Sequence, residues 1–336
     1  MISVDRALGA FYGLAIGDAL GMPTQMLPRS VVADLFGEMP WFAPGPETNK
    51  ISADRPAGSV TDDTDQAVIV ARTLIDGQGS IDVSQLAERL MEWERDMAAS
   101  GSLDLLGPST KRALAAVADG VSPDEAGRWG DTNGAAMRIT PVGIATPADP
   151  LDGLCAAVAQ ASRLTHNTGV AISGAAAVAA AVSAGVDGAD VLSATRVAQE
   201  AARLGSRHGA RHGDIEGASI TRRIPWAVRL VAGRSEDDAL DVIDHRVGTS
   251  VATEESVPAA FAVASLAPDD PWRACRLGAR LGGDSDTVAA MAGAVVGACC
   301  GLASFPAEAV ALVREVNDLD LEPIVEQLLA LRMGLA

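Results

Sequence analysis

The stretch Gly282-Gly283-Asp284-Ser285-Asp286-Thr287 stands directly before an apolar run from Val288 to Ala303. The run contains no charged residue and has the composition of a helix without a polar face. Nothing in it can neutralise the two carboxylates, and a buried charge without a partner is very costly. The stretch therefore predicts two acids that bind a ligand at the start of a buried helix.

The other dense acidic stretch is Thr61-Asp62-Asp63-Thr64-Asp65. Ser59, Thr61 and Asp62 are all residue types that cap helix N-termini, and the helix dipole favours acids there. Taken alone, the stretch is equally well explained as a heavily capped helix start. Three acids in five residues exceed what one cap can use, so we expect the two acidic stretches to meet in space.

Carboxylate and hydroxyl oxygens are ligands for hard cations such as Mg²⁺, Mn²⁺ or Ca²⁺, whereas zinc usually recruits His or Cys. The two stretches together offer more acids than one cation takes, and two ions about 3.5–4 Å apart would use them better. Neighbouring residues on a helix point about 100° apart, so Asp62 and Asp63 can each face one ion. The glycines before Asp284 permit backbone angles that let Asp284 and Asp286 converge.

The overall composition bounds the class of protein. The chain has 336 residues, 48% of them hydrophobic and only 3% aromatic, with a formal net charge of −18. Such acidity argues against nucleic acid or an anionic membrane surface as a partner, because both attract clustered Lys and Arg. Acidity by itself is also explained by solubility and does not indicate metal.

The pattern along the chain predicts an all-α fold. No segment alternates apolar and polar residues as a half-buried strand does, and no fixed repeat or interdomain linker is present. We expect one compact multi-helix domain over residues 1–336, built from roughly a dozen helices, with Pro28–Pro56 as a loop. One expected helix is opened by the stretch Ser59–Gln66 and runs through Ile75. The other expected helices are Val4–Gly21, Val83–Met97, Gly107–Ala118, Ala135–Ile144, Asp152–Leu164, Gly169–Ala184, Ala189–Leu204, Ile224–Val231, Glu236–Val247, Glu254–Leu266, Pro271–Leu281, Asp286–Ala303, Ala307–Val316 and Glu322–Met333.

Several features favour a cytoplasmic protein. Met1–Leu8 lacks the pattern of a signal peptide. Val288–Ala303 is shorter than the roughly 20 residues of a membrane span, and Gly169–Val186 is only weakly hydrophobic, so both are expected to be buried helices. The four cysteines form no C-x-x-C pair and are expected to be reduced thiols.

Three further positions leave alternatives open. His166 is either a general base or a structural hydrogen-bonding residue. Asp18 is either a surface residue or an acceptor behind the metal site. The basic stretch Arg203–Asp214, with Arg207, His208, Arg211 and His212, is either an exposed loop or a mobile segment that contacts an anionic ligand.

Five motifs in this order give the chain a resemblance to a known family, and they span nearly its whole length. The motifs are Gly13-Leu14-Ala15-Ile16-Gly17-Asp18-Ala19-Leu20-Gly21, Thr61-Asp62-Asp63-Thr64, Asn133-Gly134-Ala135-Ala136-Met137-Arg138, Leu164-Thr165-His166 and Leu281-Gly282-Gly283-Asp284-Ser285-Asp286-Thr287. With them the chain resembles the ADP-ribosylglycohydrolase family, which contains dinitrogenase reductase-activating glycohydrolase and the ADP-ribosylarginine hydrolases.

The resemblance implies an all-α glycosidase with two divalent cations, Mg²⁺ or Mn²⁺, that hold the ribose hydroxyls and a water. Its substrate would be an ADP-ribosylated protein or a small ADP-ribosyl compound. The implied metal ligands are Thr61, Asp62, Asp63, Asp284, Asp286 and Thr287. The implied catalytic residues are Asp62, Asp63, Asp286 and Asp104, and the implied substrate-binding residues are Gln25, Asn133, Gly134, His166, Gly282, Gly283 and Ser285.

The chain departs from the family pattern at two places. Gln25 stands where many relatives have Glu, and Leu105-Leu106-Gly107-Pro108-Ser109-Thr110 replaces a stretch resembling Asp-Ile-Gly-Asn-Thr-Thr, with Asp104 as the nearest acid. These differences motivate an alternative substrate, a smaller nucleoside-like N-ribosyl metabolite. A second alternative is a non-catalytic ADP-ribose-binding homologue.

Overall fold

The computed structural model describes residues 3–99, 101, 106–209 and 218–335, and the regular secondary structure in this part of the chain is helical. It consists of eighteen α-helices, one π-helical turn and one 3₁₀ turn, with a long connection over residues 37–61, and no β-strand is present among the described residues. The only bridge there pairs Thr132 with Ala252. The prediction of an all-α fold is therefore confirmed.

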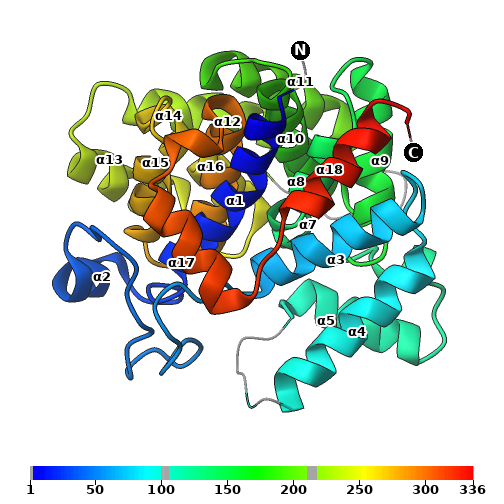
Figure 1. The fold of residues 1–336 in the computed structure, drawn as a ribbon, viewed down its shortest axis with the longest axis horizontal. Coiled ribbons are helices and arrows are strands. Elements are labelled where there is room, and N and C mark those ends of the chain that lie inside the picture. The colour runs from blue at the N-terminus through cyan, green and yellow to red at the C-terminus, as the bar shows by residue number, and fades with distance from the viewer. Residues whose placement is uncertain (1–2, 100, 102–105, 210–217, 336) are drawn as a thin grey trace.

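Figure 1 shows α1 crossing the middle of the molecule, with α4 and α5 together at one edge below α3. The α-helices are α1 (Val4–Gly21), α2 (Arg29–Phe36), α3 (Asp62–Asp76), α4 (Val83–Ala99), α5 (Pro108–Ala118), α6 (Pro123–Ala126), α7 (Gly134–Met137), α8 (Thr140–Ala145), α9 (Leu151–Ser162), α10 (Gly169–Val186), α11 (Val191–Gly209), α12 (Ile220–Val231), α13 (Glu236–Val242), α14 (Thr253–Leu266), α15 (Pro271–Ala279), α16 (Ser285–Cys300), α17 (Ala307–Asn317) and α18 (Glu322–Arg332). The π turn is Ile243–Val247 and the 3₁₀ turn is Leu302–Ser304.

Most expected helices are present with their ends shifted by a few residues, and three expectations need correction. The predicted loop Pro28–Pro56 contains helix α2, which begins directly after Pro28. The helix expected over Ala135–Ile144 is divided into α7 and α8, because Pro141 has no N–H to donate to the carbonyl oxygen of Met137 four residues earlier. The helix expected over Glu236–Val247 changes to a π turn at Ile243.

Helices α1 and α16 pack antiparallel along a stripe of small residues. A Cβ atom added to Gly9 would lie 2.4 Å from the carbonyl oxygen of Gly297, and one added to Gly13 would lie 2.3 Å from that of Gly293. The same contact continues toward the C-terminus of α1, where a Cβ on Gly21 would lie 2.3 Å from the Cα of Asp286. The two backbones touch, so the end of α1 is fixed against the start of α16.

The apolar side chains around this pair form one contiguous core cluster. Helix α10 lies within it, and 94% of the window Gly169–Val186 is buried. Its length and mean hydropathy of 1.8 would also suit a membrane span, and among the described helices it alone passes that test. The four cysteines are free thiols. We propose that residues 1–336 form one domain, which the single core cluster supports.

Candidate active site

A cavity of about 130 Å³ lies where the N-termini of α3 and α16 meet. Both acidic stretches reach it, although more than 200 residues separate them in the sequence. Its oxygen-bearing lining residues from these stretches are Asp62, Asp63, Asp284, Asp286 and Thr287. The cavity also contains Asn133 and Gly134 in its wall, so seven of the residues selected from the sequence surround one space.

Asp18, at the C-terminal end of α1, holds the start of α3 in place. Its buried carboxylate accepts hydrogen bonds from the backbone N–H groups of Thr61, at 2.9 Å, and Thr64, at 3.1 Å, and from the Thr64 hydroxyl. Burial raises the pKa of Asp18 to about 6, while the bonds from Thr64 and Thr61 oppose that rise. Asp18 is therefore the buried acceptor of the two alternatives, and it positions Thr61 without lining the cavity.

Asp63 is the most enclosed acid of the cavity, with 1% of its surface exposed. Its Oδ2 accepts a hydrogen bond from the Thr287 hydroxyl at 3.1 Å, which joins α3 to α16. Its Oδ1 is buried and has no hydrogen-bond partner among the described residues. Burial raises the pKa of Asp63 well above its usual range, and the negative charges of Asp286 and Asp18 add to that effect.

The turn before α16 depends on two glycines. Gly282 and Gly283 have φ angles of 71° and 62°, in the left-handed region that disfavours residues with a Cβ. Gly283 also touches Thr249, because a Cβ there would lie 2.4 Å from the Thr249 hydroxyl oxygen. This turn directs the Asp284 carboxylate to Asn133, whose Nδ2 donates to Oδ2 at 2.5 Å. Burial raises the pKa of Asp284, and the bond from Asn133 opposes the rise.

The acids of α3 point in different directions, as helical geometry requires. Asp62 lines the cavity and accepts a bond from Gln66 Nε2 at 2.6 Å. Asp65 faces α4 instead, where its carboxylate accepts a bond from the Trp93 indole at 2.9 Å. Thr61 is the N-cap residue of α3, and its hydroxyl accepts a bond from the Asp63 N–H. Two of the three acids therefore serve the cavity.

His166 lies behind the cavity wall rather than on its surface. Its ring nitrogens form hydrogen bonds with the hydroxyls of Thr132, at 3.0 Å, and Thr165, at 2.7 Å. Burial lowers the pKa of His166 well below its usual range, and the positive charge of Arg138 adds to that effect. The imidazole is therefore neutral, and it packs so closely on Gly134 that a Cβ there would lie 2.8 Å from its Cε1 atom.

Five other residues selected from the sequence do not line the cavity: Thr61, Gln25, Gly282, Gly283 and Ser285. Gln25 is buried, and its Nε2 has no hydrogen-bond partner in the described part of the chain. The Ser285 hydroxyl points to the turn after α1, where it lies 2.8 Å from the hydroxyl oxygen of Thr24. Gly282 packs against the carbonyl oxygen of Leu27. Asp104 lies outside the described residues.

The donor set suits a hard cation, because it consists only of carboxylate and hydroxyl oxygens. The orphaned Oδ1 of buried Asp63 is the kind of atom that a cation would satisfy. Among the described residues, however, no group of three or more His, Cys, Asp or Glu side chains stands close enough to form a finished metal site. The amides of Gln66 and Asn133 hold two of the carboxylates, so their oxygens would have to exchange partners on binding.

Comparison with known proteins shows the family to which the chain belongs. The sequence model of the ADP-ribosylglycohydrolase family matches residues 2–335. This protein belongs to the ADP-ribosylglycohydrolase family. It is 35% identical over 95% of both chains to an uncharacterized protein, YegU, from Escherichia coli K12. Over 99% of its length it is 29% identical to the ADP-ribosylarginine hydrolase Tri1 of Pseudomonas putida GB-1, of which 82% is covered.

A shorter match joins this family member to the ADP-ribosyl-[dinitrogen reductase] glycohydrolase of Rhodospirillum rubrum, with 33% identity over 48% of this chain and 52% of the other. Among solved structures, the ADP-ribosylglycohydrolase-related protein complex has a TM-score of 0.66 and 26% identity, and 99% of both chains is covered. The family and the glycosidase class expected from the motifs are thereby confirmed.

The cavity of this ADP-ribosylglycohydrolase family member also has an apolar side that sequence reasoning missed. Met26, Pro108, Met137 and Val251 line it opposite the acids. Met26 is unusual because it has a φ of 58° and remains 52% exposed at the mouth. Its neighbour Gln25 carried the family signal, but the left-handed turn sends the side chain of Met26, not that of Gln25, to the cavity.

Proposed function

We propose that the protein hydrolyses the glycosidic bond at the ribose of an ADP-ribosylated protein or a small ADP-ribosyl compound, with two divalent cations in the cavity between α3 and α16. The observation that carries the proposal is the convergence of Asp62, Asp63, Asp284, Asp286 and Thr287 on one space, with one buried carboxylate oxygen of Asp63 lacking a hydrogen-bond partner in the described residues.

Under this proposal Thr61, Asp62, Asp63, Asp284, Asp286 and Thr287 would hold the cations. Bound cations of this kind orient hydroxyl groups and lower the pKa of water. Thr61 does not line the cavity, and its hydroxyl accepts a bond from the Asp63 N–H, so it would have to exchange that bond to become a ligand. Mg²⁺ and Mn²⁺ both accept such oxygen ligands.

The remaining contribution comes from the shape and charge of the wall. Breaking a glycosidic bond produces positive character at the anomeric carbon, which carboxylates nearby stabilise. Asn133 binds both Asp284 and the Ser256 hydroxyl, so it fixes the orientation of that acid. Gly134 offers backbone without a side chain, and the buried His166 imidazole packs directly behind it.

The test is hydrolysis by the purified protein with Mg²⁺ or Mn²⁺, measured as ADP-ribose released from an ADP-ribosylated arginine protein and from small ADP-ribosyl compounds. Asp286→Asn should reduce the rate at least about 100-fold, since electrostatic contributions of this kind are typically worth that much. Asp65→Asn is the matched control, because that acid bonds to Trp93 outside the cavity and should retain nearly full activity. Equal activity of the two variants would overturn the proposal.

A second candidate keeps the same site but shortens the substrate to a nucleoside-like N-ribosyl metabolite. The observation in its favour is size, because 130 Å³ is below the roughly 300–1,000 Å³ of drug-sized ligand pockets. Release of ribose from free ribosides, with no release of ADP-ribose from any modified donor, would select this candidate. No turnover of either class, together with unchanged thermal stability on adding divalent ions, would favour a non-catalytic binding protein.

A further inference from the structure

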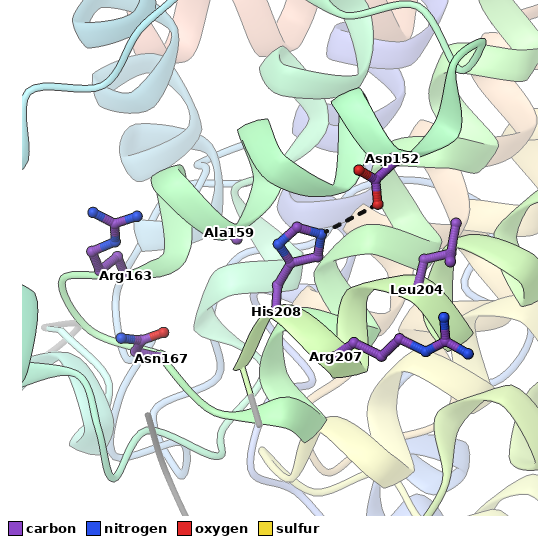
Figure 2. A pocket seen from close by; sticks show the side chains of 7 residues that line it. All are labelled: Asp152, Ala159, Arg163, Asn167, Leu204, Arg207 and His208. Atoms are coloured by element: carbon purple, nitrogen blue, oxygen red, sulfur yellow. Dashed lines mark ion pairs between the residues drawn. The ribbon is translucent and has the colours of Figure 1, made fainter. Parts of the chain in front are cut away.

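A second cavity, of about 410 Å³, lies between α9 and α11 and shares no lining residue with the candidate active site. Figure 2 shows the His208 imidazole pointing toward Asp152, with Arg163 and Asn167 on the side of the cavity away from Asp152. All its lining residues belong to the described part of the chain. Its volume is within the range of about 300–1,000 Å³ found for small-molecule sites.

Asn167 is the polar group in this cavity that needs a partner. The residue is 3% exposed, and its Nδ2 forms no hydrogen bond with any described residue. Its backbone N–H donates to the carbonyl oxygen of Gly127 at 2.8 Å, which fixes the backbone at this position. A buried donor without an acceptor costs about 1–3 kcal/mol. One water would satisfy the amide but would occupy only about 30 Å³ of the cavity.

The charges around Asn167 are mainly positive. Arg163, Arg207 and His208 line the same cavity, whereas Asp152 is its one acidic lining residue. The one ion pair of Arg163 among the described residues is with the exposed Asp124, at 3.2 Å, and exposed pairs are weak. His208 lies 3.8 Å from the Asp152 carboxylate. In a chain with a net charge of −18, most of the surface repels anions, whereas this cationic cavity attracts them.

A structural explanation accounts for part of this arrangement. Arg163 follows α9, and Arg207 and His208 are in the last turn of α11, where the helix dipole favours cations. The dipole does not explain why a buried amide donor without a partner lies among them. The helical conformation of Arg207 and His208 shows that the interpretation of this stretch as an exposed loop or mobile segment was wrong for these two residues. Arg211 and His212 lie outside the described residues.

We propose that this cavity binds a small phosphorylated molecule of about the size of a sugar phosphate. The phosphoryl oxygens accept hydrogen bonds from the Asn167 amide and from Arg163, whereas His208, beside Asp152, is a donor to another part of the molecule. Arginine suits this role because its guanidinium matches phosphate geometry. Leu204 and Ala159 provide an apolar surface for the carbon skeleton, and the Asp152 carboxylate accepts a bond from a hydroxyl group. The proposal does not depend on the reaction in the cavity between α3 and α16.

Isothermal titration calorimetry tests the site with three probes: ribose 5-phosphate, inorganic phosphate and unphosphorylated ribose. Ribose 5-phosphate should bind, and ribose should not. Weaker but measurable binding of inorganic phosphate would show that the phosphoryl group alone is recognised, whereas its tighter binding would assign the site to free phosphate. Either result supports a phosphoryl site.

Two variants locate the binding. Asn167→Asp keeps the side-chain size but replaces a donor with a negative charge, and Arg163→Ala removes a cation whose ion pair is exposed. Each should weaken binding about tenfold or more, since a hydrogen bond to a charged group is worth that much. Arg196→Ala is the matched control, because it removes an exposed cation from α11, the helix that carries Arg207 and His208, at a position outside the cavity. Circular dichroism and thermal melting verify that each variant is folded.

Absence of binding by every phosphorylated probe overturns the proposal. Equal affinity in the wild type, Asn167→Asp and Arg163→Ala also overturns it. Binding that Asp286→Asn abolishes but Arg163→Ala leaves intact would assign the probe to the candidate active site instead, and that result would likewise reject the second site.

Discussion

Replacing Gly13 by Ala should destabilise the protein although alanine favours helices. A Cβ atom at this position would lie 2.3 Å from the carbonyl oxygen of Gly293 and 2.7 Å from its carbonyl carbon. Both atoms are backbone, so neither moves aside like a flexible side chain. Normal contact requires about 3.4 Å, which means that α1 and α16 must separate by about 1 Å and lose dispersion contacts along their shared length.

The magnitude follows from two opposing effects. Overpacking a close core contact costs about 1–3 kcal/mol and sometimes more, whereas Gly to Ala inside a helix gains about 1 kcal/mol. Because the contact is between two backbones, we place the cost at the upper end and expect a net loss of about 2 kcal/mol. Urea unfolding followed by circular dichroism measures it as a lower midpoint at unchanged slope.

Gly153→Ala is the matched control in helix α9. A Cβ there would meet only Pro150 Cγ, at 3.8 Å, which is ordinary contact. This variant should be as stable as the wild type or gain up to about 1 kcal/mol. If Gly13→Ala matched Gly153→Ala in stability, the close approach of α1 and α16 would not be what these glycines provide, and the reasoning would be wrong.

Three further outcomes are expected. Asp18→Ala should lower the free energy of unfolding by about 2–3 kcal/mol, because it leaves the buried N–H groups of Thr61 and Thr64 without their acceptor. Chemical denaturation measures the loss, and a loss below about 0.5 kcal/mol would contradict the prediction. Asp63→Asn should raise the thermal midpoint in the presence of EDTA, because it removes one charge from a buried cluster that disfavours ionisation. The same variant should lose the stabilisation that Mg²⁺ or Mn²⁺ gives the wild type. An unchanged response to the metal would contradict the role of Asp63 as a ligand. His166→Gln should flatten the dependence of stability on pH below 6.5, because the folded-state pKa of His166 is lowered and the unfolded chain therefore binds the proton first. Wild-type stability should fall as the pH drops from 7 to 5, by up to about 1.4 kcal/mol per pH unit below 6.5. Equal slopes of stability against pH in the two proteins would disprove the assignment.

The sequence was sufficient to predict those parts of the site that depend on local chemistry. The N-cap residues before α3 and the glycines before α16 mark the helix starts, and acids at those starts are visible without any structure. Their convergence could also be inferred, because neither stretch contains a cation to neutralise its carboxylates. Asp62, Asp63, Asp284 and Asp286 accordingly line one cavity.

The sequence could not predict the direction of a side chain where tertiary contacts determine that direction. Ser285 lies between two acids in the sequence, yet its hydroxyl faces Thr24 because that side of α16 packs on α1. Gln25 stands at a position of known family interest, but the positive φ of the next residue brings Met26 to the cavity instead. Val251 has no local signal of any kind, since it reaches the wall only through the loop before α14.

The small-residue stripe and the acidic site are parts of one arrangement. The stripe on α1 ends at Gly21, where the backbone of α1 touches Asp286 itself, and Asp18 one turn earlier anchors the start of α3. A larger residue at Gly21 would push Asp286 away from Asp63, because there is only 2.3 Å between the added Cβ and the Asp286 Cα. The close packing of α1 therefore sets the separation of carboxylates that come from opposite ends of the chain. The negative charges of these carboxylates disfavour one another. The packing of α1, together with the hydrogen bond from Thr287 to Asp63, opposes that repulsion.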